Sequence, residues 1–144
     1  METVLVLEDE PINLKVIALA LRRAGYHVLE AADGNAAIQV CNENRKPINL
    51  LVADVQVPGI SGTVVALELL SLWPEIAILF TSGTPVIDWA PRDLAGLDHL
   101  SDAAVDFLEK PFSPLTLGNK VRQLLARPRE TRGLFSYHGE GHRE

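Results

Sequence analysis

Five short apolar runs are spaced along the chain, and most of them are hydrophobic at every position rather than at alternate ones. Such continuous hydrophobicity is typical of strands that are covered on both faces, as in a parallel sheet. The sequence therefore predicts five buried strands. They are Val4–Leu7, His27–Leu29, Leu50–Ala53, Ile76–Phe80 and Val105–Leu108.

The segments between these runs carry helical spacing and helix-end signals. Asp33 is a predicted N-cap and Gly25 a predicted C-cap residue. The predicted helices are Ile12–Ala24, Asn35–Asn44, Gly62–Trp73 and a last one that starts at Ser113-Pro114. Because strands and helices alternate, we expect an α/β fold, a doubly wound five-stranded parallel sheet with helices on both faces. Sheets of this kind bind ligands at the carboxyl ends of their strands.

A length of 144 residues, with 47% hydrophobic and 22% charged residues, is typical of one globular domain. We expect this domain to occupy residues 1–127 and residues 128–144 to form a flexible tail. The net charge of −6 argues against a nucleic-acid partner. An acidic start and the lack of an apolar stretch of ~20 residues predict a cytoplasmic protein that does not enter membranes. The single cysteine, Cys41, excludes an internal disulfide.

Polar and charged residues follow four of the predicted strands. Glu8 and Asp9 follow the first strand, Asp54 the third, Thr81 the fourth and Lys110 the fifth. Carboxylates gathered at one edge of a sheet repel one another unless a cation intervenes, and hard oxygen ligands suit Mg²⁺. A hydroxyl and an ammonium beside such a site are suitable donors to phosphoryl oxygens. The fitting chemistry is transfer of a phosphoryl group onto a carboxylate.

Four strings of sequence carry these residues in order, each at a predicted strand end. The strings are Val4-Leu-Val-Leu-Glu8-Asp9-Glu10-Pro11, Asp54-Val-Gln-Val-Pro58-Gly59-Ile-Ser-Gly62, Leu79-Phe-Thr81-Ser82-Gly83 and Phe107-Leu-Glu-Lys110-Pro111-Phe112. With these strings, the chain from about Val4 to Ala126 resembles the receiver domain of two-component response regulators. The resemblance implies a flavodoxin-like strand order of 2-1-3-4-5.

The resemblance also implies a phosphorylation site with Mg²⁺ as its cofactor. Asp54 corresponds to the phosphoacceptor. Glu8 and Asp9 correspond to the acidic pair at the metal site, with Asp9 ranked ahead of Glu8 as a direct ligand. Asp54 itself and the backbone carbonyl of Gln56 would complete the protein's metal ligands.

A switch is implied by the same resemblance. Thr81 corresponds to the hydroxyl that follows the phosphoryl group, and Lys110 to its counter-ion. Phe107 matches the aromatic switch position, although an aromatic residue in a buried strand also serves simply as core. Pro111 matches a Lys-Pro pair that is usually joined by a cis peptide bond.

The chain departs from the receiver pattern between Thr81 and Lys110, which lie 29 residues apart, several more than in most receivers. The extra length falls in Thr84–Ser101, and its prolines and glycine predict a loop with one short helix. We expect Trp89 within this segment to be partly exposed and to report activation. Trp73, at the end of the third predicted helix, should not report it.

Two other functions fit the residues less well. A haloacid-dehalogenase-type phosphohydrolase also uses an Asp at a strand end, but it needs a second Asp two residues later, where this chain has Gln56. A flavodoxin-like cofactor binder would need Ser, Thr and Gly after the first strand, whereas Glu8 and Asp9 repel a phosphate. The four histidines, His27, His99, His138 and His142, are too scattered to form a metal site.

As a receiver, the chain would take its phosphoryl group from a histidine kinase or a histidine phosphotransfer protein and would not be a dedicated enzyme. Its downstream target is not indicated, and homodimerisation is left open. The last two matching strings resemble receivers of hybrid histidine kinases, which favours a module excised from such a kinase. A Met just before the first strand and the tail after the last helix favour a stand-alone protein instead.

Overall fold

A computed structural model of the chain describes residues 1–100 and 103–127. Within these ranges five strands alternate with five α-helices, and one short 3₁₀ helix, η1, precedes α4. The elements are β1 (Thr3–Leu7), α1 (Pro11–Arg23), β2 (His27–Ala31), α2 (Gly34–Glu43), β3 (Leu50–Asp54), α3 (Gly62–Leu72), β4 (Ala77–Ser82), η1 (Val86–Asp88), α4 (Pro91–Asp98), β5 (Ala104–Glu109) and α5 (Pro114–Ala126).

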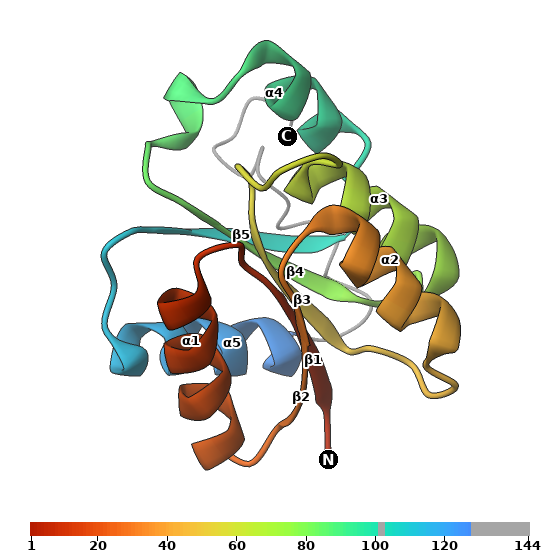
Figure 1. Cartoon of the computed structure of the whole chain (residues 1–144), viewed down its shortest axis with the longest axis vertical. Helices are drawn as coiled ribbons and strands as arrows, with labels where there is room; N and C mark the ends of the chain where they lie inside the picture. Colours follow the sequence, from red (N-terminus) through yellow and green to blue (C-terminus); the bar gives the residue numbers. More distant parts are fainter. Residues whose placement is uncertain (101–102, 128–144) are drawn as a thin grey trace.

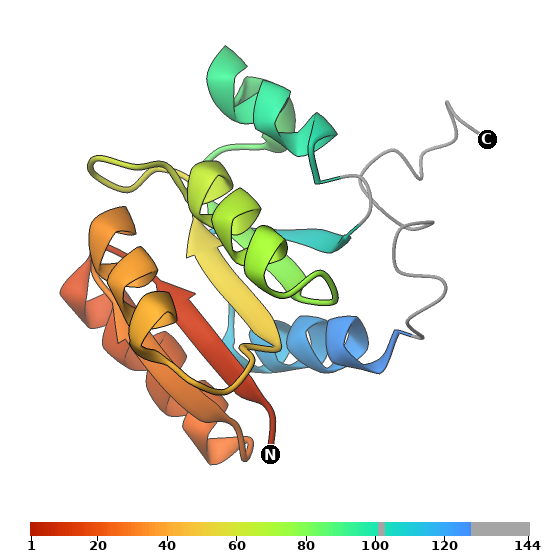
Figure 2. The ribbon, with the colours of Figure 1, turned by 90° about the vertical axis from the view of Figure 1, so that its right-hand side faces the viewer.

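The strands form one parallel sheet in the order β2-β1-β3-β4-β5. Helices α1 and α5 cover one face, and α2 and α3 cover the other (Figure 1). In the view turned by 90°, α2 and α3 lie across the near side of the sheet (Figure 2). The doubly wound architecture, the strand order and all five strands predicted from the sequence are therefore confirmed.

The central strands contain uninterrupted apolar runs because each face of the sheet packs against a helical layer. In β3, Leu51 belongs to the hydrophobic core on the α2 and α3 side, whereas Leu50 and Val52 belong to the core on the α1 and α5 side. All residues of β1, β3 and β4 are buried. Continuous burial on two faces is what the uninterrupted apolar runs predicted.

Side-chain caps define where the helices begin. Asp33 Oδ1 accepts a hydrogen bond from Ala36 N at 2.8 Å, which confirms it as the N-cap of α2. Ser113 caps α5 in the same way. The C-cap of α1 is Ala24 rather than the predicted Gly25, which follows it with a φ of +101°, a conformation that disfavours residues with a Cβ. The predicted helix ends were displaced by one or two residues at most.

The lengthened segment between β4 and β5 contains a loop, η1 and the short helix α4, close to the predicted loop with one helix. The prediction that Trp89 is partly exposed is wrong, because its side chain is 4% exposed. Its ring contacts Phe80 and Phe107, and its indole N–H donates to the carbonyl of Thr84 at 3.3 Å. Trp73 is half-buried at the end of α3.

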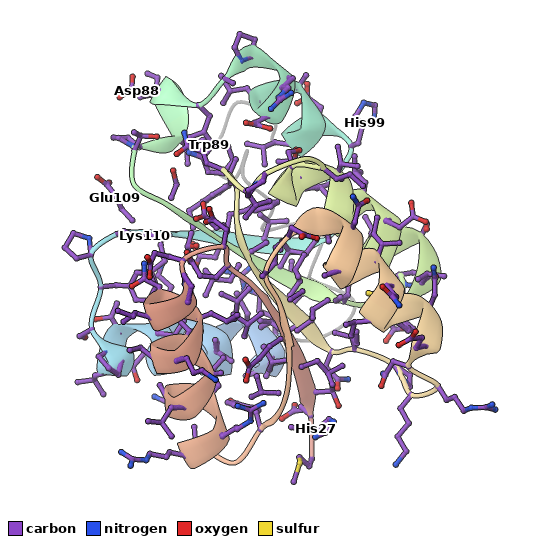
Figure 3. All side chains as sticks on the ribbon, viewed as in Figure 1. His27, Asp88, Trp89, His99, Glu109 and Lys110 are labelled. Atoms are coloured by element: carbon purple, nitrogen blue, oxygen red, sulfur yellow. The ribbon has the colours of Figure 1, made fainter. Side chains whose placement is uncertain are left out.

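The structure bears on only part of what was predicted for the tail, the histidines and membrane segments. The predicted tail, residues 128–144, lies outside the described residues, as do His138 and His142. His27 and His99 lie at opposite ends of the molecule (Figure 3), so these two do not share a site. Among the described helices, none is long and apolar enough to cross a membrane.

Cys41 should make the stability of the protein depend on pH in the alkaline range. Burial raises the pKa of this thiol to about 11, and the charge of Glu68 adds to the effect. In the unfolded chain a thiol ionises near pH ~8.5. The free energy of unfolding should therefore fall as pH rises from about 8.5 to about 11, because only the unfolded chain releases the proton.

Urea unfolding at several alkaline pH values measures this slope. Cys41→Ala is the control, since it keeps every other titrating group and removes the thiol. The wild-type protein should lose more stability over this pH range than the variant. Identical slopes for the two proteins would contradict the prediction.

Candidate functional site

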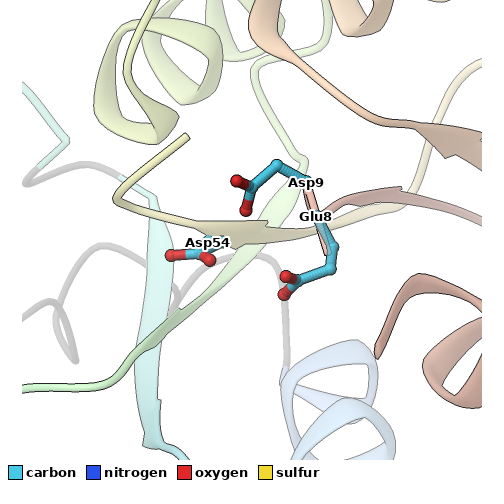
Figure 4. Close-up of side chains that lie close together, drawn as sticks. All are labelled: Glu8, Asp9 and Asp54. Carbon is cyan, nitrogen blue, oxygen red and sulfur yellow. The ribbon is translucent and has the colours of Figure 1, made fainter. Parts of the chain in front are cut away.

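Three carboxylates gather at the carboxyl ends of β1 and β3. Glu8 and Asp9 follow β1, Asp54 ends β3, and one ligand atom from each lies within 4.8 Å of the other two (Figure 4). Glu8 and Asp54 are buried, whereas Asp9 is exposed. The chain turns from β1 to one side of the sheet and from β3 to the other, which makes this edge the topological switch point. The cluster could hold a metal ion, and its oxygen ligands fit Mg²⁺.

Among the described residues, Lys110 is the cation that contacts this cluster. Its Nζ atom lies 2.9 Å from Glu8 Oε1 and 2.9 Å from Asp54 Oδ2. Partial burial disfavours the charged ammonium, but the hydrogen bonds and charges of Asp54 and Glu8 outweigh that effect and raise the pKa of Lys110. One ammonium does not balance three carboxylates, so the cluster favours a further cation.

The carboxylate of Asp54 is held at both of its oxygens. Oδ2 contacts Lys110, and Oδ1 accepts a hydrogen bond from the backbone N–H of Gln56 at 2.9 Å. The backbone of Gln56 thus lies at the site while its side chain is exposed. That the carbonyl of Gln56 is a metal ligand stays a prediction.

The loop after Asp54 folds back against that residue, and Gly62 permits the close approach. Gly62 N donates to Val55 O at 3.3 Å. A Cβ atom at Gly62 would lie 2.5 Å from the carbonyl oxygen of Asp54, closer than any real contact. Gly62 was part of a string that matches the receiver pattern, but the sequence did not explain why a glycine stands there. The close packing against Asp54 explains it.

Thr81 is the neighbour of Asp54 in the next strand. The two residues pair in the register of β3 and β4, and Val55 N donates to Thr81 O at 3.1 Å. Thr81 is buried, and the next residue, Ser82, accepts a backbone hydrogen bond from Lys110 N at 2.8 Å. The backbones of three strands therefore bring the predicted acceptor, hydroxyl and ammonium to one place. The Lys110-Pro111 peptide bond is cis, as expected.

Phe107 is not part of the carboxylate cluster. It pairs with Phe80 in the β4 and β5 register, and the two rings stack at 6.1 Å with an interplanar angle of 23°. Since Phe80 immediately precedes Thr81, the ring of Phe107 lies one position along the strands from the predicted hydroxyl. Its role as a switch stays a prediction.

Two further contacts near the site were missed by sequence reasoning. Trp89 packs against Phe80 and Phe107, and Asp93 of α4 is buried with its carboxylate 3.4 Å from Thr63 Oγ1. Only the large aromatic side chain of Trp89 gave a usable signal, because such a side chain is buried on average even in irregular segments. No sequence pattern links Asp93 to Thr63, which is 30 residues away.

Comparison with known proteins agrees with this geometry. The family model of the response regulator receiver domain matches residues 4–122. The chain is 33% identical to the probable transcriptional regulatory protein TcrX of Mycobacterium tuberculosis, over 87% of this chain and 50% of that protein. It is 34% identical to the sensor kinase CckA of Brucella abortus, over 85% of this chain and 12% of that protein.

The solved receiver domain of the hybrid histidine kinase CckA has a similar structure. Its TM-score is 0.68 at 35% identity, covering 85% of this chain and 98% of that domain. The chain thus belongs to the receiver domain family of response regulators, whose members are signalling modules of two-component systems rather than dedicated enzymes. It spans half or less of the length of the full-length relatives TcrX and CckA.

Gly62→Ala should disturb the site and the fold together. The added methyl group overlaps the carbonyl of Asp54, so the start of α3 or the loop must shift. We expect a fall of several degrees in the melting temperature, equivalent to about 1–3 kcal/mol of overpacking. Gly118→Ala is the matched control, because a Cβ there meets nothing within 4 Å and alanine favours the helix. Differential scanning calorimetry of both variants tests this, and equal melting temperatures would contradict it.

Proposed function

We propose that this receiver is controlled by phosphorylation on Asp54, with the phosphoryl group supplied by a histidine kinase or a histidine phosphotransfer protein. The observation that carries the proposal is the arrangement around Asp54. A buried carboxylate lies at the switch point of a doubly wound sheet, held by Gln56 N and Lys110 and flanked by two further carboxylates. Family membership supports the same reaction.

In the transfer step a carboxylate oxygen of Asp54 attacks phosphorus. An oxygen–phosphorus bond forms, the nitrogen–phosphorus bond of the donor's phosphohistidine breaks, and the imidazole leaves with the electron pair and takes up a proton. Asp9, Asp54 and the Gln56 carbonyl would hold Mg²⁺, with Glu8 beside them. Bound Mg²⁺ supplies positive charge that offsets the negative charge of the phosphoryl oxygens.

Lys110 and Thr81 serve the product of this step. Lys110 already contacts the acceptor carboxylate, so its ammonium can pair with a phosphoryl oxygen after a small movement. Thr81, the strand neighbour of Asp54, supplies the hydroxyl that is drawn toward the same group. Movement at Thr81 then biases the position of Phe107, a two-state element coupled to the site.

The phosphohydrolase alternative receives no support from the site. The position two residues after Asp54 holds the exposed side chain of Gln56, which is not an acid or a base. The similarity to CckA is compatible with a receiver that is part of a hybrid kinase, and that to TcrX with one that is part of a transcriptional regulator. We place the reaction in the cytoplasm, where ATP-dependent histidine kinases form phosphohistidine.

Incubation with acetyl phosphate and Mg²⁺ should add one phosphoryl group to the protein. Intact-mass spectrometry should detect the product in the wild type, whereas Asp54→Asn and treatment with EDTA should each abolish it. Asp88→Asn is the control, since Asp88 is exposed in η1 and points away from the site (Figure 3). Labelling of Asp54→Asn at another acid would overturn the assignment.

Asp9→Ala should weaken Mg²⁺ binding more than Glu8→Ala. Both oxygens of Glu8 are engaged, Oε1 by Lys110 and Oε2 by Glu10 N at 3.1 Å, whereas Asp9 is open to solvent. Losing a residue that orients the metal ligands without binding the metal typically lowers metal affinity by about 10- to 100-fold, and losing a direct ligand lowers it more. Calorimetric Mg²⁺ titration of both variants, with the remote surface variant Glu43→Ala as control, measures the ranking. Equal losses would show that the ranking is wrong.

A further inference from the structure

Trp89 lies in the lengthened segment yet is fastened to the core of the protein. Its ring meets Phe80 edge-on at 5.7 Å and Phe107 at 5.6 Å, and these two phenyl rings stack on each other. Three aromatic rings therefore form a closed cluster, which we call the aromatic triad. Figure 3 shows Trp89 pointing inward between the α4 segment and the sheet, in contrast to its neighbour Asp88.

The triad is tied to the end of β4 by hydrogen bonds. The indole N–H of Trp89 donates to Thr84 O at 3.3 Å, and Thr84 N donates to Ser82 Oγ at 3.1 Å. Ser82 directly follows Thr81 and accepts from Lys110 N. Trp89 thus links the turn after Thr81 on one side to the ring of Phe107 on the other.

This arrangement is that of the unmodified acceptor. Lys110 Nζ contacts Asp54 Oδ2 directly at 2.9 Å, so a phosphoryl group on Asp54 would have to separate the two. If Thr81 moves toward that group, the turn that holds Thr84 moves with it. That movement would act on the hydrogen bond and on the ring contacts of Trp89 at the same time.

Phe107 borders a hollow at the surface of the protein. It has a volume of about 180 Å³ and is also lined by Trp89, Phe80 and the turn at Thr84. Packed interiors prefer discrete arrangements to continuous deformation, so we expect the ring to have a held position, which the structure shows, and a released one. The contacts of Trp89 stabilise the held position.

We propose that Trp89 is a positioning residue that restrains activation by holding Phe107 against Phe80. This inference rests on the proposed function and adds to it a side chain that sets how readily the switch operates. Any interaction present only in the resting state lowers the population of the activated state. The extra length between Thr81 and Lys110 thereby supplies a restraint within the chain itself.

The test compares the affinity for beryllium fluoride, a phosphoryl mimic, in the presence of saturating Mg²⁺. Trp89→Leu removes both edge contacts and the N–H donor, and it should bind the mimic about fivefold more tightly or better, the effect of losing two aromatic pairs. Its melting temperature should fall, while its affinity for Mg²⁺ alone should stay unchanged. Trp73→Leu is the matched control, because Trp73 is a half-buried Trp at the C-cap of α3 and outside the triad, and it should leave the affinity for the mimic unchanged.

A double-mutant comparison separates positioning from general packing. In a Phe107→Leu background, Trp89→Leu should have no further effect on the affinity for the mimic. Trp89→Phe, which keeps a ring and loses the N–H donor, should show a smaller change in the same direction and guards against misfolding of the leucine variant. Unchanged or weaker binding of the mimic by both Trp89 variants, with normal wild-type binding, would overturn the inference alone. Failure of the wild type to bind the mimic would overturn the proposed function.

Discussion

Repulsion among the carboxylates at the end of β1 and β3 is the constraint around which the rest of the molecule is arranged. Two of the three, Glu8 and Asp54, are buried, where charge is costly unless it is paired. Lys110 supplies the pairing from β5, which is two strands away from β3 in the sheet. A parallel sheet with crossover helices is what brings residues from such distant parts of the chain to one edge.

The surrounding backbone fixes the position of the acceptor Asp54 at that edge. Gln56 N holds one oxygen of Asp54, and Gly62 lets the returning loop lie against the Asp54 carbonyl. Ser61 caps α3 at the end of the same loop, so the helix begins where the loop ends. The acceptor is therefore positioned by main-chain contacts on both sides, and the contact at Gly62 leaves no room for a side chain at that position.

The sequence predicted the strands and the clustered site residues because both follow from local patterns. Continuous apolar runs indicate strands covered on two faces, and the fold class then places their following residues together. Trp89 escaped this reasoning because its burial depends on Phe80 and Phe107, which reach it only through tertiary packing. The sequence placed Lys110 at the same edge as the carboxylates, but its particular hydrogen bond to Glu8, 102 residues away, has no local signal.

The contacts of Asp93 and Trp89, which the sequence did not predict, both attach the lengthened segment to the rest of the domain. Asp93 is buried against Thr63, and Thr63 Oγ1 lies 3.0 Å from Ser61 Oγ. Ser61 and Thr63 lie at the start of α3, the helix that follows the acceptor loop. Trp89 meets the other side of the site through the turn after Thr81. Helix α4 is thus attached to the start of α3 through Asp93, and Trp89, two residues before α4, is attached to the turn after β4. Because Asp93 is attached to the start of α3 and Trp89 to the turn after β4, we expect a displacement at this edge of the sheet to be passed on to the lengthened segment.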